Sequence, residues 1–251
     1  MFIDTHCHLS RQDYDNIDMV IEESKQSGVD IMIISGCSKE SIEESLELSR
    51  KFDNIYVTLG YHPSEATSVT DADLVELETL LKSDKVVGLG EIGLDYYYGK
   101  EDKQLQISLF EKQLAIASEL KLPVVIHSRD AVKDTIDILK KYSVTGVIHC
   151  FGGSLETARL YIGMGYSLGI GGVLTFKNSN LSKVVEQLPL ESLVLETDSP
   201  YLAPTPYRGK QNSSKYIPII ADFLAQIKGV SSDYVANVTT NNAKRIFKVE
   251  K

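Results

Sequence analysis

Phe2-Ile3-Asp4-Thr5-His6-Cys7-His8 opens the chain and carries the pattern that decides the fold. The apolar run Phe2–Thr5 predicts a strand, and two histidines stand at its end. Because side chains alternate along a strand, His6 and His8 should project from one face while Cys7 faces the other way. Two imidazoles on one face can bind one metal ion. The alternative is a pair of buried histidines, each with its own hydrogen-bond partner.

Seven further apolar runs follow, each short enough for a parallel strand that is buried on both faces. They are Val29–Ile34, Ile55–Leu59, Val86–Leu89, Val124–Ile126, Thr145–Ile148, Tyr166–Ile170 and Ser192–Leu195. Amphipathic segments separate them, such as the helix face of Ile17, Val20 and Ile21. Eight strands alternating with helices predict an α/β fold, a (β/α)8 TIM barrel, with an open doubly wound sheet as the alternative. Two more helices are expected near 216–228 and 231–247, packed on the outside of the barrel.

Length and composition suit one intracellular domain. The 251 residues fit a single barrel, and the absence of a linker or repeat predicts one domain over 1–251. No basic segment with a long apolar run opens the chain, and no stretch reaches the roughly 18 apolar residues of a membrane span. Three cysteines without C-x-x-C spacing favour a cytoplasmic location. The net charge of −9 excludes a globally basic surface, so nucleic acid would need a local basic patch and bound metal.

Seven metal-capable side chains stand at or just past the ends of predicted strands. They are His6, His8, His62, Glu91, His127, His149 and Asp198. A barrel gathers the C-terminal ends of its strands at one mouth, whereas an open sheet spreads them along an edge. These residues therefore favour the barrel and predict a centre for two divalent metal ions. Histidine ligands favour Zn2+ or Mn2+, with abundant Mg2+ as the alternative.

Three of these residues are expected to be catalytic. The two oxygens of Glu91 can bind two cations at once, and Asp198 can bind metal with one oxygen and accept a proton with the other. His62 stands apart from the ligand strands, which favours contact with the substrate or leaving group; a structural turn histidine is the alternative. His127 and His149 occupy matching positions on neighbouring strands and would bind the second metal, although a capping or core role is open for each.

Basic residues near the ligands are candidates for substrate binding. Arg129 follows His127 by two residues and could hold an anion with two hydrogen bonds. The loop 207–212 contains Arg208 and Lys210 and suits a phosphate-binding lid, with an ordinary solvated loop as the alternative. No Walker A motif occurs, so no phosphate-binding loop of that kind is indicated.

Three carboxylates close to the ligands have more than one interpretation. Asp4 could orient a ligand histidine from behind. Asp95 suits either a turn or the support of a ligand. Glu196 suits either an acid in the barrel interior or a salt bridge.

Taken together, the motifs resemble those of the TatD family of metal-dependent hydrolases over essentially the whole chain. The matching stretches are FIDTHCH at 2–8, GYHP at 60–63, GEIGLDYY at 90–97, PVVIHSRDA at 123–131, IHCFGG at 148–153, LETDSPYLAP at 195–204 and RGKQN at 208–212. The resemblance implies a TIM barrel with two divalent cations and a deoxyribonuclease, a 3′→5′ exonuclease on single-stranded DNA or 3′ ends. By position it implies the ligands His6, His8, Glu91, His127, His149 and Asp198. Asn212-Ser213-Ser214 departs from the Asn-Glu-Pro often found in the family, which concerns loop contacts and not the metal set.

Two other functions stay open at this stage. The same site could hydrolyse an ester or amide, such as an aminoacyl-tRNA linkage, because activated water attacks carbonyl carbon equally well. A non-enzymatic binding module is disfavoured by the complete ligand set. A monomer without membrane association is the expected state.

Overall fold

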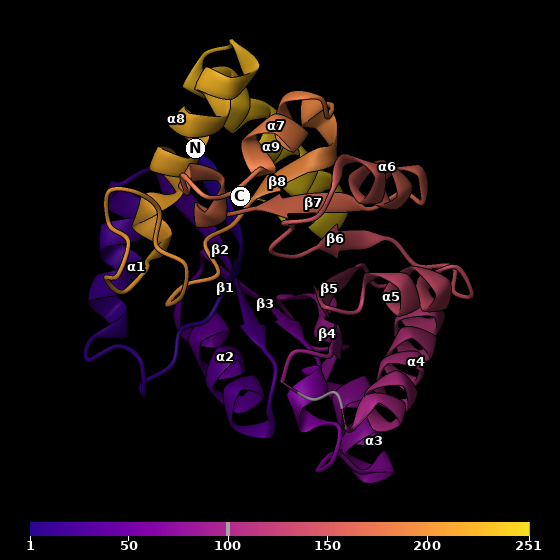
Figure 1. Ribbon diagram of the computed structural model, residues 1–251. Helices are drawn as coiled ribbons and strands as arrows, with labels where there is room; N and C mark the ends of the chain where they lie inside the picture. The colour runs from indigo at the N-terminus through magenta and orange to yellow at the C-terminus, as the bar shows by residue number, and fades with distance from the viewer. Residues whose placement is uncertain (99–100, 251) are drawn as a thin grey trace. The chain divides into compact units, whose positions relative to one another are not determined.

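The computed structural model describes residues 1–98 and 101–250, in which short strands alternate with helices (Figure 1). The strands are β1 Phe2–Cys7, β2 Val29–Gly36, β3 Ile55–Leu59, β4 Val86–Asp95, β5 Val124–Arg129, β6 Gly146–Ile148, β7 Ser167–Ile170 and β8 Leu193–Leu195. The α-helices are α1 Ile17–Gln26, α2 Lys39–Lys51, α3 Asp71–Leu80, α4 Lys103–Leu120, α5 Val132–Leu139, α6 Leu155–Gly163, α7 Leu181–Glu186, α8 Ile217–Lys228 and α9 Ser232–Phe247. The strands follow one another in the sheet in chain order, which confirms the predicted (β/α)8 fold class.

The chain divides into two compact units. One contains Met1–Ile34 and the chain from Cys150 onward, and the other contains Ser35–His149. A single domain over 1–251 stays a prediction. Within 1–98 and 101–250, no helix combines the length and the hydropathy that crossing a membrane requires.

In the first unit, β1 pairs in parallel with β2, and β7 pairs in parallel with β8. Past the end of β8, the Asp198 N–H donates to the carbonyl of His6 at 3.0 Å, and the His8 N–H donates to that of Ser199 at 2.7 Å. The backbone after β8 therefore runs alongside the end of β1. This pairing brings the polar residues that follow the two strands together.

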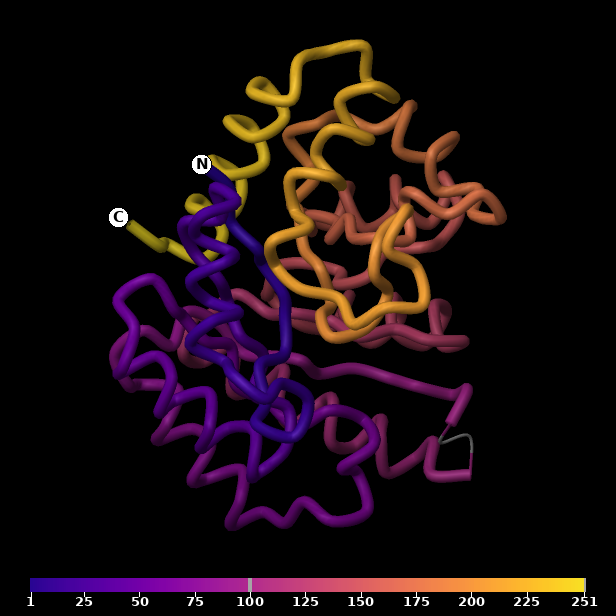
Figure 2. The backbone as a smooth tube through the Cα atoms, turned by 90° about the vertical axis from the view of Figure 1, so that its left-hand side faces the viewer, coloured from indigo at the N-terminus to yellow at the C-terminus, as the bar shows by residue number. Residues whose placement is uncertain are grey.

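Both helices expected near the C-terminus form within one residue of their predicted starts. Helix α9 packs on β1 and β8, where the Asn242 amide donates to the carbonyls of Leu190 at 3.0 Å and Leu193 at 2.8 Å. The N-terminus lies beside the same helix (Figure 2), and the Thr240 hydroxyl donates to the carbonyl of Met1 at 3.2 Å. Helix α8 ends at Lys228 and is capped by Gly229, whose φ of 64° suits a residue without a side chain.

In the second unit, β4 lies between β3 and β5 and is longer than the sequence predicts. The apolar run ends at Leu89, but the strand continues to Asp95, so Glu91 lies inside the strand and not after it. The register passes from Leu89 opposite Val124 to Ile92 opposite Ile126, which leaves one extra residue on β4. Bulges of this kind redirect side chains and occur often beside active sites.

The bulge depends on a glycine. A Cβ added at Gly90 would lie 2.6 Å from the Cβ of Val125 and 2.7 Å from its carbonyl oxygen. No real side chain fits there, so the close approach of β4 and β5 beside Glu91 requires the absence of a Cβ.

We expect Gly90→Ala to destabilise the protein by roughly 1–3 kcal/mol, the usual cost of forcing an extra methyl into a packed interior. Chemical denaturation monitored by circular dichroism measures the difference. Gly163→Ala is the matched control, because a Cβ at Gly163 would meet nothing within 4 Å. Equal losses in the two variants would contradict the role given to Gly90.

Candidate metal centre

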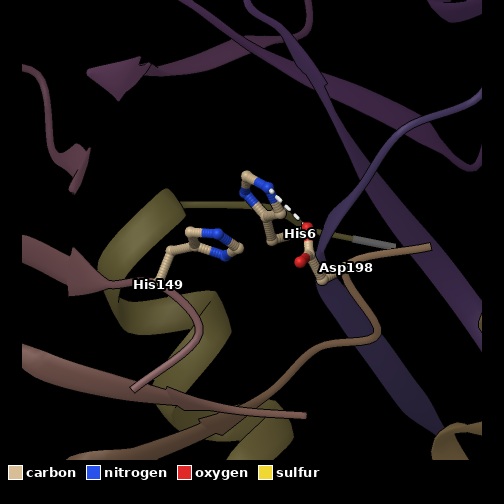
Figure 3. Close-up of side chains that lie close together, drawn as sticks. All are labelled: His6, His149 and Asp198. Carbon is tan, nitrogen blue, oxygen red and sulfur yellow. Dashed lines mark ion pairs between the residues drawn. The ribbon is translucent and has the colours of Figure 1, made fainter. Parts of the chain in front are cut away.

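The first unit brings three predicted ligands together at the ends of β1 and β8. His6 Nε2 and His8 Nε2 lie 3.2 Å apart, and Asp198 Oδ1 lies 3.7 Å from the first and 3.6 Å from the second. Figure 3 shows the His6 ring and the Asp198 carboxylate turned toward each other. A point equidistant from the three atoms would lie about 2.0 Å from each, the length of a Zn–N or Zn–O bond. The donor set and its spacing therefore fit a divalent cation.

Backbone geometry aims these side chains as the strand pattern predicts. Cys7 faces the other way from its neighbours, is fully buried and donates through its thiol to the carbonyl of Ile33 at 3.6 Å. Asp198 has a φ of 56°, a left-handed conformation that aspartate tolerates better than most residues. A non-glycine residue held there is common at functional sites.

A buried carboxylate supports this cluster, as the sequence suggests for Asp4. Its Oδ1 accepts the backbone N–H groups of His6 at 3.3 Å and Thr197 at 3.0 Å, and its Oδ2 accepts the Thr197 hydroxyl at 2.6 Å. Burial raises the pKa of Asp4 to about 7, although these bonds and one from the Ser214 hydroxyl oppose the rise. Asp4 thus ties β1 to the segment that carries Asp198.

The tripeptide Asn212-Ser213-Ser214, which departs from the family pattern, also contacts the segment that carries Asp198. The Asn212 amide donates to the carbonyls of Thr197 at 2.7 Å and Tyr201 at 2.6 Å. Ser213 and Ser214, the two residues that differ from the family pattern, are both buried. The departure is therefore not confined to an exposed loop.

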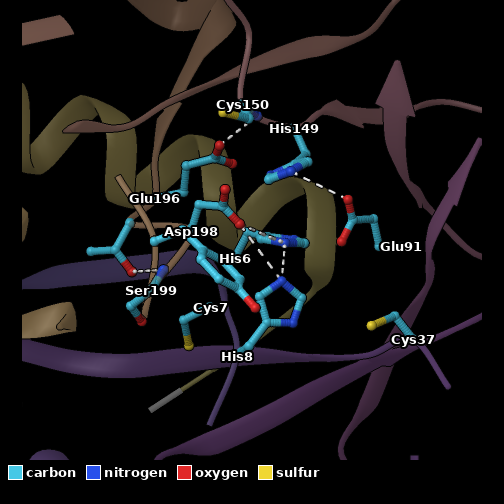
Figure 4. A network of polar contacts seen from close by, with 12 residues as sticks. His6, Cys7, His8, Cys37, Glu91, His149, Cys150, Glu196, Asp198 and Ser199 are labelled. Carbon is cyan, nitrogen blue, oxygen red and sulfur yellow. Dashed lines mark hydrogen bonds and ion pairs between the residues drawn. The ribbon is translucent and has the colours of Figure 1, made fainter. Parts of the chain in front are cut away.

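Glu196 is buried in the interior of the first unit, in line with one of its two interpretations. Its Oε1 accepts the backbone N–H of Cys150 at 2.5 Å (Figure 4). The carboxylate fits because the facing residue is Gly169, where a Cβ would lie 2.0 Å from Glu196 Oε2. Glu196 therefore fixes the start of the segment that follows His149 in sequence.

In the second unit, three imidazoles face one buried oxygen of Glu91. Its Oε1 lies 2.7 Å from His127 Nδ1, 3.3 Å from His149 Nε2 and 3.9 Å from His62 Nε2. Potential ligand atoms of Glu91, His127 and His149 all lie within 4.8 Å of one another. The expectation that these three act together agrees with this geometry, and a carboxylate with two imidazoles is a donor set that suits Zn2+ or Mn2+.

His62 lies against this cluster, which corrects the expectation that it stands apart. Its ring meets that of His127 edge to face, with centroids 4.5 Å apart. Its Nδ1 accepts the backbone N–H of Ser64 at 3.1 Å, so the proton of the neutral ring resides on Nε2. That nitrogen faces Glu91 as a donor and is poorly prepared to bind metal. The geometry favours the substrate contact expected for His62.

His127 is held between two carboxylates. Its Nε2 lies 3.3 Å from Asp95 Oδ2, opposite the bond between Nδ1 and Glu91. Burial lowers the pKa of His127, but the bonds to Asp95 and Glu91 outweigh it and raise the pKa above its ordinary value. Burial likewise raises the pKa of Asp95, yet hydrogen bonds from His127 and two backbone N–H groups lower it to about 2. Asp95 therefore forms the turn and also supports the candidate ligand His127, which are the two roles that the sequence allows for it.

The predicted substrate-binding cations lie on aromatic rings. The Arg129 guanidinium stands 4.0 Å from the Tyr97 ring centre and 4.8 Å from that of Tyr98, a pair that the sequence analysis did not single out. Three consecutive tyrosines, Tyr96 to Tyr98, directly after a ligand-bearing strand were the available signal. The Arg208 guanidinium lies 3.8 Å from the centre of the Phe176 ring.

The loop 207–212 is anchored at both ends. At one end Tyr207 stacks on Tyr216, with ring centres 4.4 Å apart. At the other, the buried Asn212 accepts the Tyr14 hydroxyl on its carbonyl at 2.8 Å. Lys210 is exposed between these anchors, which places its charge at the surface.

Comparison with known proteins identifies what the chain is similar to. The family model described as TatD-related DNase matches residues 3–248. YabD of Bacillus subtilis, named as an uncharacterized metal-dependent hydrolase, is 40% identical over 99% of this chain and 100% of its own length. YcfH of Escherichia coli K12, which has the same description, is 36% identical over 99% of this chain and 96% of its own.

A solved structure has the same fold. The crystal structure of YjjV, a TatD homologue from Escherichia coli K12, superposes with a TM-score of 0.93 at 31% identity and covers 99% of this chain and 98% of its own. The similarity extends over both compact units and supports the (β/α)8 fold class.

We expect His62→Ala to keep its full metal content, because His62 Nε2 carries a proton and offers no lone pair. His127→Ala should instead lose about one equivalent of metal per chain, since its ring is a ligand candidate. Elemental analysis after dialysis against metal-free buffer compares the two variants. Loss of an equivalent from His62→Ala alone would make His62 the ligand and contradict the proton assignment.

Proposed function

The chain belongs to the family of TatD-related DNases, and we propose that it is a phosphodiesterase that removes nucleotides from DNA in the 3′→5′ direction. Metal-dependent hydrolysis is common to this family and to the curated relatives. The observation that carries the finer proposal is the pair of clusters, each with carboxylate and imidazole atoms at the spacing of metal ligands. Two cations are what phosphodiester hydrolysis commonly uses to stabilise the attacking and leaving oxygens.

In this proposal His6, His8 and Asp198 would hold one cation in the first unit, and Glu91, His127 and His149 would hold another in the second. When bound, the cations lower the pKa of water and stabilise the charge that grows on the phosphoryl oxygens. The protein's own part is to fix the donors, through Asp4 behind β1 and through the bulge on β4.

Two side chains move or hold protons. Asp198 Oδ1 faces His6 and His8, and this position suits a carboxylate that orients the attacking water and accepts its proton. His62 presents its Nε2 proton beside Glu91, where a donor suits the oxygen of a leaving group.

The chain carries a net charge of −9, so its surface as a whole does not attract phosphate. A few local basic side chains would therefore have to bind the phosphates of the substrate. Arg129, Arg208 and Lys210 are all exposed, and each comes after a predicted ligand in the sequence, His127 or Asp198. Their position agrees with contacts to the DNA backbone on either side of the scissile bond.

A substrate panel tests the proposal. Protein loaded with Mg2+, Mn2+ or Zn2+ is incubated with 5′-labelled single-stranded DNA, 3′-blocked DNA, a small phosphodiester and an acylated tRNA. We expect stepwise shortening of the DNA from its free 3′ end and little release from the blocked strand. Hydrolysis of the acylated tRNA alone would replace the proposal with an acyl-ester hydrolase.

Glu91→Gln should lower DNA hydrolysis by more than about 100-fold, beyond the 10–100-fold typical of residues that only support a ligand. The amide keeps the shape of the side chain but removes the negative charge that would bind a cation beside His127 and His149. Initial rates at saturating metal measure the loss, and circular dichroism checks the fold. Activity within tenfold of the unmodified protein would contradict the role assigned to Glu91.

Arg208→Ala combined with Lys210→Ala should weaken binding of single-stranded DNA and flatten its dependence on salt. Each lost phosphate contact reduces the slope of log affinity against log salt by roughly 0.7, so two contacts give about 1.4. A salt titration of DNA binding measures the slope, with hydrolysis of a small phosphodiester as the internal control. An unchanged slope would show that the loop does not contact the backbone.

A further inference from the structure

An aromatic and cationic group stands at the C-terminal ends of β4 and β5 in the second unit. The rings of Tyr97 and Tyr98 meet edge to face, with centroids 4.6 Å apart and planes at 89°. The Arg129 guanidinium lies against both rings, at 4.0 and 4.8 Å from their centres. These three side chains form one compact group, called the tyrosine platform below.

The platform is not part of the core. Tyr97 is 58% exposed and Tyr98 is 77% exposed, and Arg129 is exposed as well. Large aromatic rings at the surface, held in place by a cation, resemble the stacking surfaces of proteins that bind single strands. Stability alone gives little reason for two adjacent rings to remain in water.

A buried carboxylate joins the platform to the metal-ligand cluster. Asp95 Oδ1 accepts the backbone N–H groups of Tyr97 at 2.9 Å and Tyr98 at 3.1 Å. Its other oxygen, Oδ2, lies 3.3 Å from Nε2 of His127. The Tyr96 backbone N–H also donates to the carbonyl of Arg129 at 2.9 Å, which joins the segment of the two tyrosines to the end of β5. The backbone that carries the two rings is therefore fixed relative to His127.

We propose that the tyrosine platform stacks an unpaired base of single-stranded nucleic acid while Arg129 contacts an adjacent phosphate. The proposal rests on the phosphodiesterase function and assigns the contact with the substrate's base to these two rings. A base inside a duplex has both faces covered by its neighbours, so a stacking surface selects unpaired nucleotides. Because every base has a π face, the platform should favour single strands without strong preference for sequence.

Binding without divalent metal tests the platform separately from catalysis. The probes are a fluorescein-labelled oligothymidylate and an oligomer of equal length in which abasic sugars replace the thymidines. Both oligomers carry the same phosphates, but only the oligothymidylate has bases that can stack on the tyrosine rings. Fluorescence anisotropy in EDTA gives the affinity of the unmodified protein and of the double variant Tyr97→Leu, Tyr98→Leu. We expect the double variant to lose about fivefold or more on oligothymidylate and to match the unmodified protein on the abasic oligomer.

Two control variants separate stacking from general damage. Tyr97→Phe with Tyr98→Phe keeps the rings and should retain the affinity of the unmodified protein. Tyr142→Leu removes a tyrosine from the segment before β6, at the opposite strand ends from the platform, and should change neither affinity. Because tyrosine is uncharged, the leucine variant should also keep the salt dependence, whereas Arg129→Met should reduce its slope by roughly 0.7.

The outcomes distinguish this inference from the proposed function. Equal losses on both oligomers, or no loss on either, would overturn the platform, and DNA hydrolysis by the unmodified protein would leave the phosphodiesterase standing. A loss confined to oligothymidylate supports the platform. If the unmodified protein then failed to hydrolyse any phosphodiester with metal, the proposed function alone would fall.

Discussion

A carboxylate that is buried away from water needs a partner for its charge, and three imidazoles of the second unit lie close to the buried Glu91. One oxygen has His127 at 2.7 Å and His149 at 3.3 Å, with His62 at 3.9 Å. Such a charge is costly to bury unless it is paired or binds metal. The glycine bulge that turns Glu91 toward the histidines therefore makes sense as part of a cation site.

In the first unit, one carboxylate faces the histidines and a second, buried carboxylate holds the backbone of the segments that carry them. Asp198 faces His6 and His8, while the buried Asp4 sets the backbone of both segments through Thr197. The ligands thus stand on strand ends whose positions are fixed by buried hydrogen bonds. This arrangement separates stability, carried by the apolar parts of the strands, from chemistry, carried by the residues at and just past their C-terminal ends.

Much of the fold follows from the sequence because parallel strands buried on both faces must be apolar, and the histidines mark where they end. The extension of β4 through Glu91 to Asp95 was not predictable, since the bulge arises from the close approach of β5 to Gly90. The position of His62 beside Glu91 and the platform of Tyr97 likewise depend on contacts between distant segments. Periodicity carries no information about such contacts.

The central claim is that the histidine and carboxylate clusters each hold a divalent cation. Anomalous diffraction from crystals grown with Mn2+ tests it most directly, because the signal locates the ions without reference to activity. The account predicts one ion bound by His6, His8 and Asp198 and a second bound by His127 and His149, with Glu91 as a ligand. The absence of anomalous density at Glu91 under saturating Mn2+ would contradict it.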